Sequence, residues 1–215
     1  MAAVDGFDMK VKGKGSHGAT PWEGIDPIVV ACQIVDGLQT IVSRQTALTE
    51  AAAVVTVGTF HAGVRRNIIP DEAFLQGTIR TFGPEMQKKV HEKIKLTATK
   101  IAEASGATAE VTINIMFPAT INDVKLTEKM VPSLVKAAGK ENVNVISAVT
   151  MAEDFSFYQQ KVPGFFFFLG AYPAEMKLEK KPAHHTADFM IDEKSFSVGV
   201  KALLNLTVDY LTPSK

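Results

Sequence analysis

Apolar and polar residues alternate in the first half of the chain in segments typical of half-buried strands. The clearest are FDMKVK at 7–12 and TAEVTINIM at 108–116, and two further runs with strand composition lie at 51–60 and 72–82. Two other segments repeat their apolar residues at helical spacing. The pattern therefore predicts the order strand, helix, strand, strand, helix, strand.

The start of the first helix is well marked. Asp26 suits the N-cap, and Pro27 suits the first helical position because its missing N–H would be unpaired there. The second helix opens at Pro84 and carries lysines on its polar face. The apolar face of the first helix is formed by Ile28, Ala31, Ile34, Val35, Leu38, Ile41 and Val42.

The order β-α-β-β-α-β is the ferredoxin-like arrangement, in which both helices cover one face of an antiparallel sheet. We expect this domain to span residues 7–117, within a mixed α/β (α+β) chain. Such a sheet leaves one face and an edge strand to be covered by a neighbour.

The pattern changes at Pro118. It predicts a helix at about 124–139, a short strand at about 143–147, a helix at about 153–160, a strand at 163–170 and a terminal helix from Asp192. That alternation indicates an α/β layer with too few strands for a sheet of its own. We therefore expect residues 118–215 to be a portion of a domain.

Composition narrows the classes of function. Acidic and basic residues number 23 each, so charge gives no support for a nucleic-acid or anionic-membrane partner. The most apolar run, 165–170, is too short to span a bilayer, and we expect no signal peptide in the first residues. Cys32 is the one cysteine, within an apolar helical pattern. We expect a cytoplasmic, soluble protein without an internal disulfide, in which the Cys32 thiol is buried.

Two clusters are candidates for metal or acid–base chemistry. His184 and His185 are adjacent, and neutral imidazole is a common zinc ligand, but two ordinary loop histidines would have the same spacing. Glu153 and Asp154 are adjacent carboxylates. The spacing from Thr150 to Glu153 favours a helix capping box for Glu153 and leaves the role of Asp154 open.

Three further residues are candidates for binding. Arg80 shares a strand face with Gln76 and Thr78, where an arginine either binds a carboxylate or is solvated. Asn67 precedes that strand. His17 stands between glycines, and its position alone would suit a loop residue.

Four stretches occur in a familiar order: GKGSHGATPWEGIDPI, GVRRNIIPDEAFLQGTIRTF, MAEDFSFY and HHTADFMIDEKSF. They resemble the aminoacylase, hippurate hydrolase and carboxypeptidase family of two-metal amidohydrolases and metallopeptidases. The resemblance runs from about Phe7 to the C-terminus. It implies that a ferredoxin-like lid and dimerisation domain is inserted into a zinc-binding α/β catalytic domain. Residues 7–117 would be the lid, and 118–215 the C-terminal portion of the catalytic domain.

The resemblance also implies roles for single residues. His17 matches the lid histidine that reaches the partner subunit's active site and stabilises the tetrahedral oxyanion. Asn67 and Arg80 match lid positions that hold the substrate carboxylate. His185, rather than His184, matches the C-terminal metal ligand, although Ala187 stands where the motif usually has proline.

One departure from the family decides what we expect of this chain. It has neither the His-x-Asp nor the adjacent glutamates that supply most metal ligands and the general base in that family. We expect part of a metal-dependent hydrolase of N-acyl amino acids or small peptides with a free carboxylate. It would form homodimers through the lid and use two divalent ions, zinc, manganese or cobalt. Alone it would be inactive, without a complete metal site. The alternative is a non-catalytic homodimerisation module.

Overall fold

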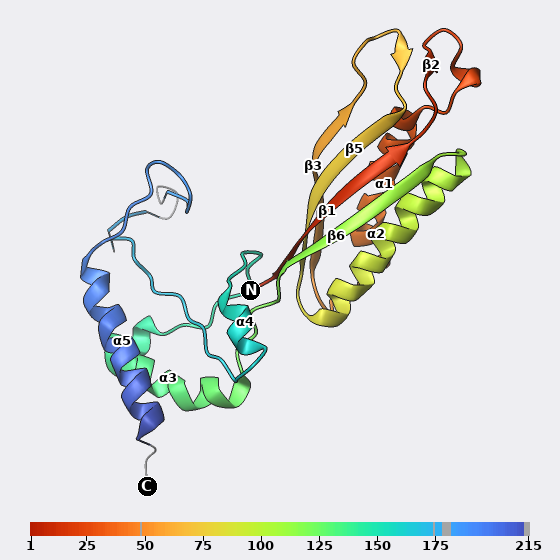
Figure 1. Ribbon diagram of the computed structural model, residues 1–215. Helices are drawn as coiled ribbons and strands as arrows, with labels where there is room; N and C mark the ends of the chain where they lie inside the picture. The colour runs from red at the N-terminus through yellow and green to blue at the C-terminus, as the bar shows by residue number, and fades with distance from the viewer. Residues whose placement is uncertain (48, 174, 178–181, 213–215) are drawn as a thin grey trace. The chain divides into compact units, whose positions relative to one another are not determined.

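The computed structural model describes residues 1–47, 49–173, 175–177 and 182–212. The chain divides into two compact units (Figure 1). Unit 1 comprises Met1–Thr120 together with Ala148–Gln160, and unit 2 comprises Ile121–Ser147 together with Lys161–Lys215.

Unit 1 contains the predicted four-stranded antiparallel sheet. Its strands are β1 (Ala3–Lys12), β3 (Ala53–Ala62), β5 (Glu72–Thr81) and β6 (Thr108–Phe117), in the spatial order β3-β5-β1-β6. Helices α1 (Pro27–Gln45) and α2 (Pro84–Ala104) lie side by side on one face of this sheet (Figure 1). Together these elements form the ferredoxin-like fold predicted from the sequence.

The core of unit 1 lies between the sheet and the two helices. Alternate residues of β1 and β5 point into it, and Phe7, Leu75 and Ile79 are almost completely buried there. Ile34 and Leu38 of α1 pack against them from the helical layer. The residues that alternate along the strands and those that recur at helical spacing thus face the same core.

Helix α1 begins as predicted. The Asp26 carboxylate accepts a hydrogen bond from the Ile28 amide at 2.9 Å, and Pro27 occupies the first turn. The prediction of a buried Cys32 is wrong, because its side chain is exposed. Cys32 follows the buried Ala31 directly, and one residue turns a helix by about 100°, so its side chain points away from the core.

The other face of the sheet is polar, and its side chains pair across the strands. Asp8 accepts hydrogen bonds from Gln76 and Asn114, both at 2.6 Å. The Lys12 ammonium donates to Glu110 at 2.5 Å, and this bond lowers the pKa of Glu110 and raises the pKa of Lys12.

Residues 148–160 join unit 1 at the start of β1. The Ala2 amide is shared between the carbonyls of Val149 and Met151, each at 3.1 Å. Helix α4 (Phe155–Gln159) follows. The prediction of a capping box at Thr150 is wrong, because the helix begins five residues later. Glu153 instead accepts a hydrogen bond from the Asp154 amide at 3.0 Å.

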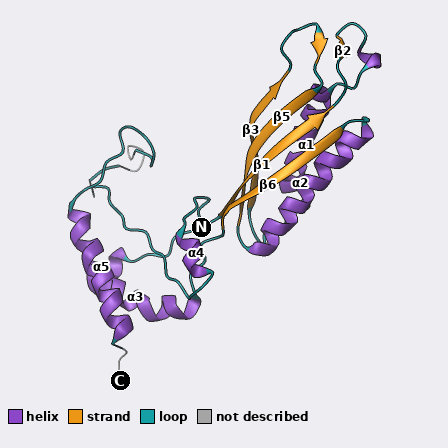
Figure 2. Ribbon diagram, in the orientation of Figure 1, coloured by secondary structure: helices purple, strands orange, loops and turns teal. Residues whose placement is uncertain are grey.

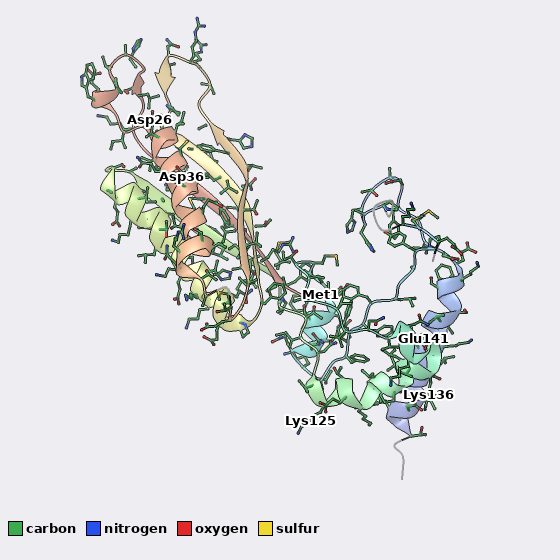
Figure 3. The ribbon with its side chains drawn as sticks, turned by 180° about the vertical axis from the view of Figure 1, so that it is seen from behind. Met1, Asp26, Asp36, Lys125, Lys136 and Glu141 are labelled. Atoms are coloured by element: carbon green, nitrogen blue, oxygen red, sulfur yellow. The ribbon has the colours of Figure 1, made fainter. Side chains whose placement is uncertain are left out.

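Unit 2 is built from helices and loops in its described part (Figure 2). Helix α3 (Val124–Ala138) lies against α5 (Lys194–Leu211), and a 3-10 turn follows α3 at Lys140–Asn142. Asp209 accepts hydrogen bonds from Ser133 at 2.7 Å and from Lys136 at 2.8 Å (Lys136 is labelled in Figure 3). These bonds lower the pKa of Asp209, chiefly through Lys136.

The two strands predicted at 143–147 and 163–170 are not formed. A strand needs a neighbour that satisfies its amides and carbonyls, and no other strand lies in the described residues of unit 2. Across the described residues, none of the helices is long and apolar enough to cross a membrane.

Candidate functional site

His17 and Asn67 meet at one end of unit 1. The short strand β2 (Ser16–His17) pairs with β4 (Ile68–Ile69), and this places His17 opposite Ile68. The Gly18 amide donates to the Asn67 carbonyl at 2.9 Å. This ribbon lies at the end of the sheet remote from the N-terminus (Figure 1).

The glycines around His17 are explained by close backbone approaches. A side chain at Gly13 would lie 2.1 Å from the Ile25 carbonyl oxygen, and one at Gly18 would lie 3.1 Å from that of Asn67. Asp71 fixes the same segment, because its carboxylate accepts from the Gly15 amide at 2.8 Å. The glycine-rich stretch is therefore a tightly folded support for His17.

The His17 ring has one hydrogen-bond partner within its own turn. The Ala19 amide donates to its Nδ1 at 3.0 Å, and the Thr20 amide donates to the His17 carbonyl at 2.9 Å. The side chain is otherwise exposed. The ring thus stands at the surface in a set orientation.

A pocket of about 580 Å³ lies beside the ribbon, between the loops at 18–28 and 62–69. Its lining includes Arg65 and Arg66, and also Asp26 at the start of α1 (Figure 3). Cationic, anionic and apolar side chains thus all line this pocket.

Arg80 lies far from this pair in the same chain. It is paired with Val4 of β1, whereas the ribbon follows the other end of β1 at Lys12. The eight residue steps from Val4 to Lys12 span roughly 26 Å at about 3.3 Å per residue. Arg80 shares the polar face with Gln76 and Thr78, as the alternation predicts. One chain therefore cannot place His17, Asn67 and Arg80 around one small substrate.

The histidine pair lies in unit 2. His185 has a positive φ of 65°, and the His184 ring packs on Phe189 with centroids 4.9 Å apart. Among the described residues, no three His, Cys, Asp or Glu side chains gather as a metal site. His185 by itself does not fit a metal centre, which needs three or four protein ligands.

A buried polar cluster was missed from the sequence. Asp5 is fully buried on the core side of β1. It accepts from Gln87 Nε2 at 3.0 and 2.9 Å and pairs with His91 Nε2 at 2.7 Å. The spacing of Gln87 and His91, four residues apart on one helix face, was the available signal. This cluster fastens α2 to the start of β1.

Comparison with known proteins identifies the class of unit 1. Residues 4–109 match the family model of the peptidase dimerisation domain. The chain is 36% identical over its whole length to an N-acetylcysteine deacetylase of Bacillus subtilis, and 34% identical over 98% of its length to thermostable carboxypeptidase 2 of Saccharolobus solfataricus.

Solved structures agree with this result. A Bacillus subtilis protein described as a dinuclear metal-binding peptidase of the M20 family matches 98% of the chain, with a TM-score of 0.74 and 32% identity. A structure from methicillin-resistant Staphylococcus aureus matches the same share, with a TM-score of 0.84 and 29% identity. The chain therefore belongs to the M20 family of metallopeptidases and amidohydrolases. It spans about half the length of these relatives, 51% to 54%.

Proposed function

We propose that this chain supplies the lid and dimerisation domain, and the C-terminal portion of the catalytic domain, of a metal-dependent amidohydrolase. The complete enzyme would cleave N-acyl amino acids or small peptides with a free carboxylate. The observation that carries this proposal is the match over nearly the whole chain to a deacetylase and a carboxypeptidase. Both names describe hydrolysis of an amide bond.

The separation of Arg80 from His17 and Asn67 along β1 supports an active site that is built from residues of two chains. His17 and Asn67 would act in the partner's active site, with His17 as a hydrogen-bond donor to the tetrahedral oxyanion. Arg80 would hold the substrate carboxylate in a different active site from the one that its own His17 serves. In a two-fold dimer, each site would then receive His17 and Asn67 from one chain and Arg80 from the other.

The complete enzyme would hold two divalent metal ions, zinc or alternatively manganese or cobalt, which would activate water for attack on the amide. His185 would be one ligand. The other ligands and the general base would come from residues outside this chain, and the chain alone would be inactive.

The dimer contact would use the edge strand β3 and helix α1. β3 is an edge of the sheet and α1 packs beside it. Val29 on α1 is about half exposed. Leu96 on α2 is equally exposed and serves as a matched control. Val29→Asp should weaken the dimer by tenfold or more in sedimentation equilibrium, and Leu96→Asp should leave it unchanged. Equal effects of the two variants would contradict this interface.

Activity is best tested in a chimera. The part of the Bacillus subtilis deacetylase that this chain does not match would be joined to the 215 residues. The chimera should hydrolyse N-acetyl amino acids when supplied with zinc or manganese, and the chain alone should not. A folded, metal-loaded dimeric chimera without activity on a panel of N-acyl amino acids and dipeptides would sink the proposal.

The two-chain site predicts a particular mixing result. Arg80→Ala and Asn67→Ala chimeras should each be inactive. Their equal mixture, after subunit exchange, should recover about a quarter of the original activity, because half of the dimers are mixed and each has one intact site. No recovery in dimers that demonstrably exchange would contradict the sharing of residues between chains.

A further inference from the structure

The hydrogen bond from Ala19 to His17 determines which ring nitrogen of His17 carries the proton. The donor is a backbone amide at 3.0 Å from Nδ1, and a backbone N–H can only donate. Nδ1 must therefore present its lone pair. Neutral imidazole has one ring proton, which then lies on Nε2.

The surrounding backbone holds this geometry. The residue between donor and acceptor, Gly18, donates to the Asn67 carbonyl at 2.9 Å, and Thr20 donates to the His17 carbonyl at 2.9 Å. The Thr20 hydroxyl also donates to Glu23 at 3.1 Å. The turn is thus closed on both sides of Ala19. Its amide is held facing the ring rather than solvent.

We propose that the turn from His17 to Thr20 is a positioning device that fixes His17 as the neutral Nε2–H tautomer. In this form the exposed nitrogen donates a hydrogen bond and has no lone pair with which to accept a proton. His17 therefore serves as a neutral donor and not as a general base. Ala19 is the positioning residue, and it acts through its backbone.

In this turn the Ala19 N–H occupies the lone pair of Nδ1, so Nε2 is the ring nitrogen that remains to contact a substrate. The role in catalysis rests on the proposed function, whereas the tautomer rests on the turn alone.

The test is nuclear magnetic resonance of the 15N-labelled 215-residue chain, at a pH where the imidazole is neutral. A scalar coupling across the hydrogen bond, between the Ala19 amide nitrogen and His17 Nδ1, is expected. The ring couplings should show an unprotonated Nδ1 and a protonated Nε2. A protonated Nδ1, or a ring that averages between both tautomers without this coupling, overturns the proposal.

Variants supply a second readout. His17→Phe removes the acceptor, so exchange of the Ala19 amide should accelerate roughly 2- to 10-fold, as expected for loss of one net hydrogen bond. His61→Phe, at an exposed histidine of β3, should leave that exchange rate unchanged. Ala19→Pro should release the ring to both tautomers, and Ala19→Ser, which keeps the amide, should not. Equal exchange rates in the two histidine variants would count against the device.

The outcome of these experiments is independent of the outcome of the activity test. If the coupling is present and the chimera is inactive, the positioning device stands and the proposed function fails. If the chimera is active and the coupling is absent, the positioning device fails alone. In an active chimera, Ala19→Pro should lower kcat while leaving KM nearly unchanged, because the donor is needed mainly in the transition state.

Discussion

Units 1 and 2 carry similar apolar patterns but bury very different cores. Unit 1 buries one continuous cluster between its sheet and helices, with Ile34, Leu38 and Ile94 fully inside. In the described part of unit 2, only Met130, Leu134 and Ala202 are buried apolar residues. Along α5, large apolar side chains remain more than half exposed: Phe196, Val200, Leu203, Leu204, Val208, Tyr210 and Leu211.

The difference shows that the apolar face of an amphipathic helix indicates a need for an apolar partner surface. It does not show whether the same chain supplies that surface. The apolar face of α1 is received by a sheet formed within the same chain. Helix α5 has α3 beside it and no sheet among the described residues. An exposed apolar surface of this kind marks an interaction site.

The largest contrast should appear in hydrogen exchange. Amides in the centre of α1 and β1 should open only with global unfolding, at about 5–15 kcal/mol. Amides of α5 should open at a few kcal/mol or less, because little apolar surface is buried around them. Native-state exchange across a urea series measures both. Equal protection in the two units would contradict the expected difference in their stability.

A matched pair of leucines tests the same contrast by truncation. Leu38 is fully buried, whereas Leu203 is 60% exposed. Leu38→Ala should lower the free energy of unfolding of unit 1 by about 2–5 kcal/mol, through lost burial and a cavity. Leu203→Ala should change the free energy of unfolding of unit 2 by less than about 0.5 kcal/mol. Urea unfolding followed by circular dichroism gives both values, and a large effect at Leu203 would show a core in unit 2.

A pair of strand glycines sharpens the account of unit 1. A side chain at Gly77 would lie 2.1 Å from the Thr56 carbonyl oxygen and 2.3 Å from the Phe7 ring. At Gly58 the nearest such atom is 3.9 Å away. Gly77→Ala should therefore cost about 1–3 kcal/mol of stability by overpacking. Gly58→Ala should be close to neutral, and thermal unfolding of both variants checks the difference.

The smallest expected effect concerns acid and unit 2. The pKa of Asp209 is lowered by Lys136 and Ser133, so its bonds stabilise the contact of α3 with α5 at neutral pH. This stabilisation is complete above the ordinary aspartate pKa of about 3.9 and is lost as the pH falls through the lower folded value. Exchange rates of α5 amides should rise across that range. Asp209→Asn should remove the pH dependence, and an unchanged profile in this variant would contradict the assignment.

Local signals in the sequence were sufficient for most of unit 1. The alternation in FDMKVK and TAEVTINIM, and the Asp26-Pro27 start of α1, rest on interactions within a few residues. Two predictions failed on local detail. Cys32 lies just outside the buried stripe of its helix, and helix α4 begins five residues after Thr150, which rules out the capping box.

In the candidate site, too, sequence motifs indicated the residues, whereas the fold determined where they lie. The sequence indicated His17, Asn67, Arg80 and His185 through their resemblance to family motifs. Their roles stay predictions. Only the fold brought His17 and Asn67 together, because β2 and β4 pair across the fifty residues of intervening chain, 18–67. Only the register of β1 with β5 set Arg80 at the opposite end.

The sequence by itself determined the order of elements in unit 1, the start of its first helix and the face that each element buries, because periodicity and capping are local properties. The tertiary structure decided which of those elements found partners. It paired the ends of distant strands, left 143–147 and 163–170 without a neighbouring strand, and turned the Ala19 amide onto His17. These outcomes depend on hydrogen-bond partners supplied across space, and no local pattern encodes them.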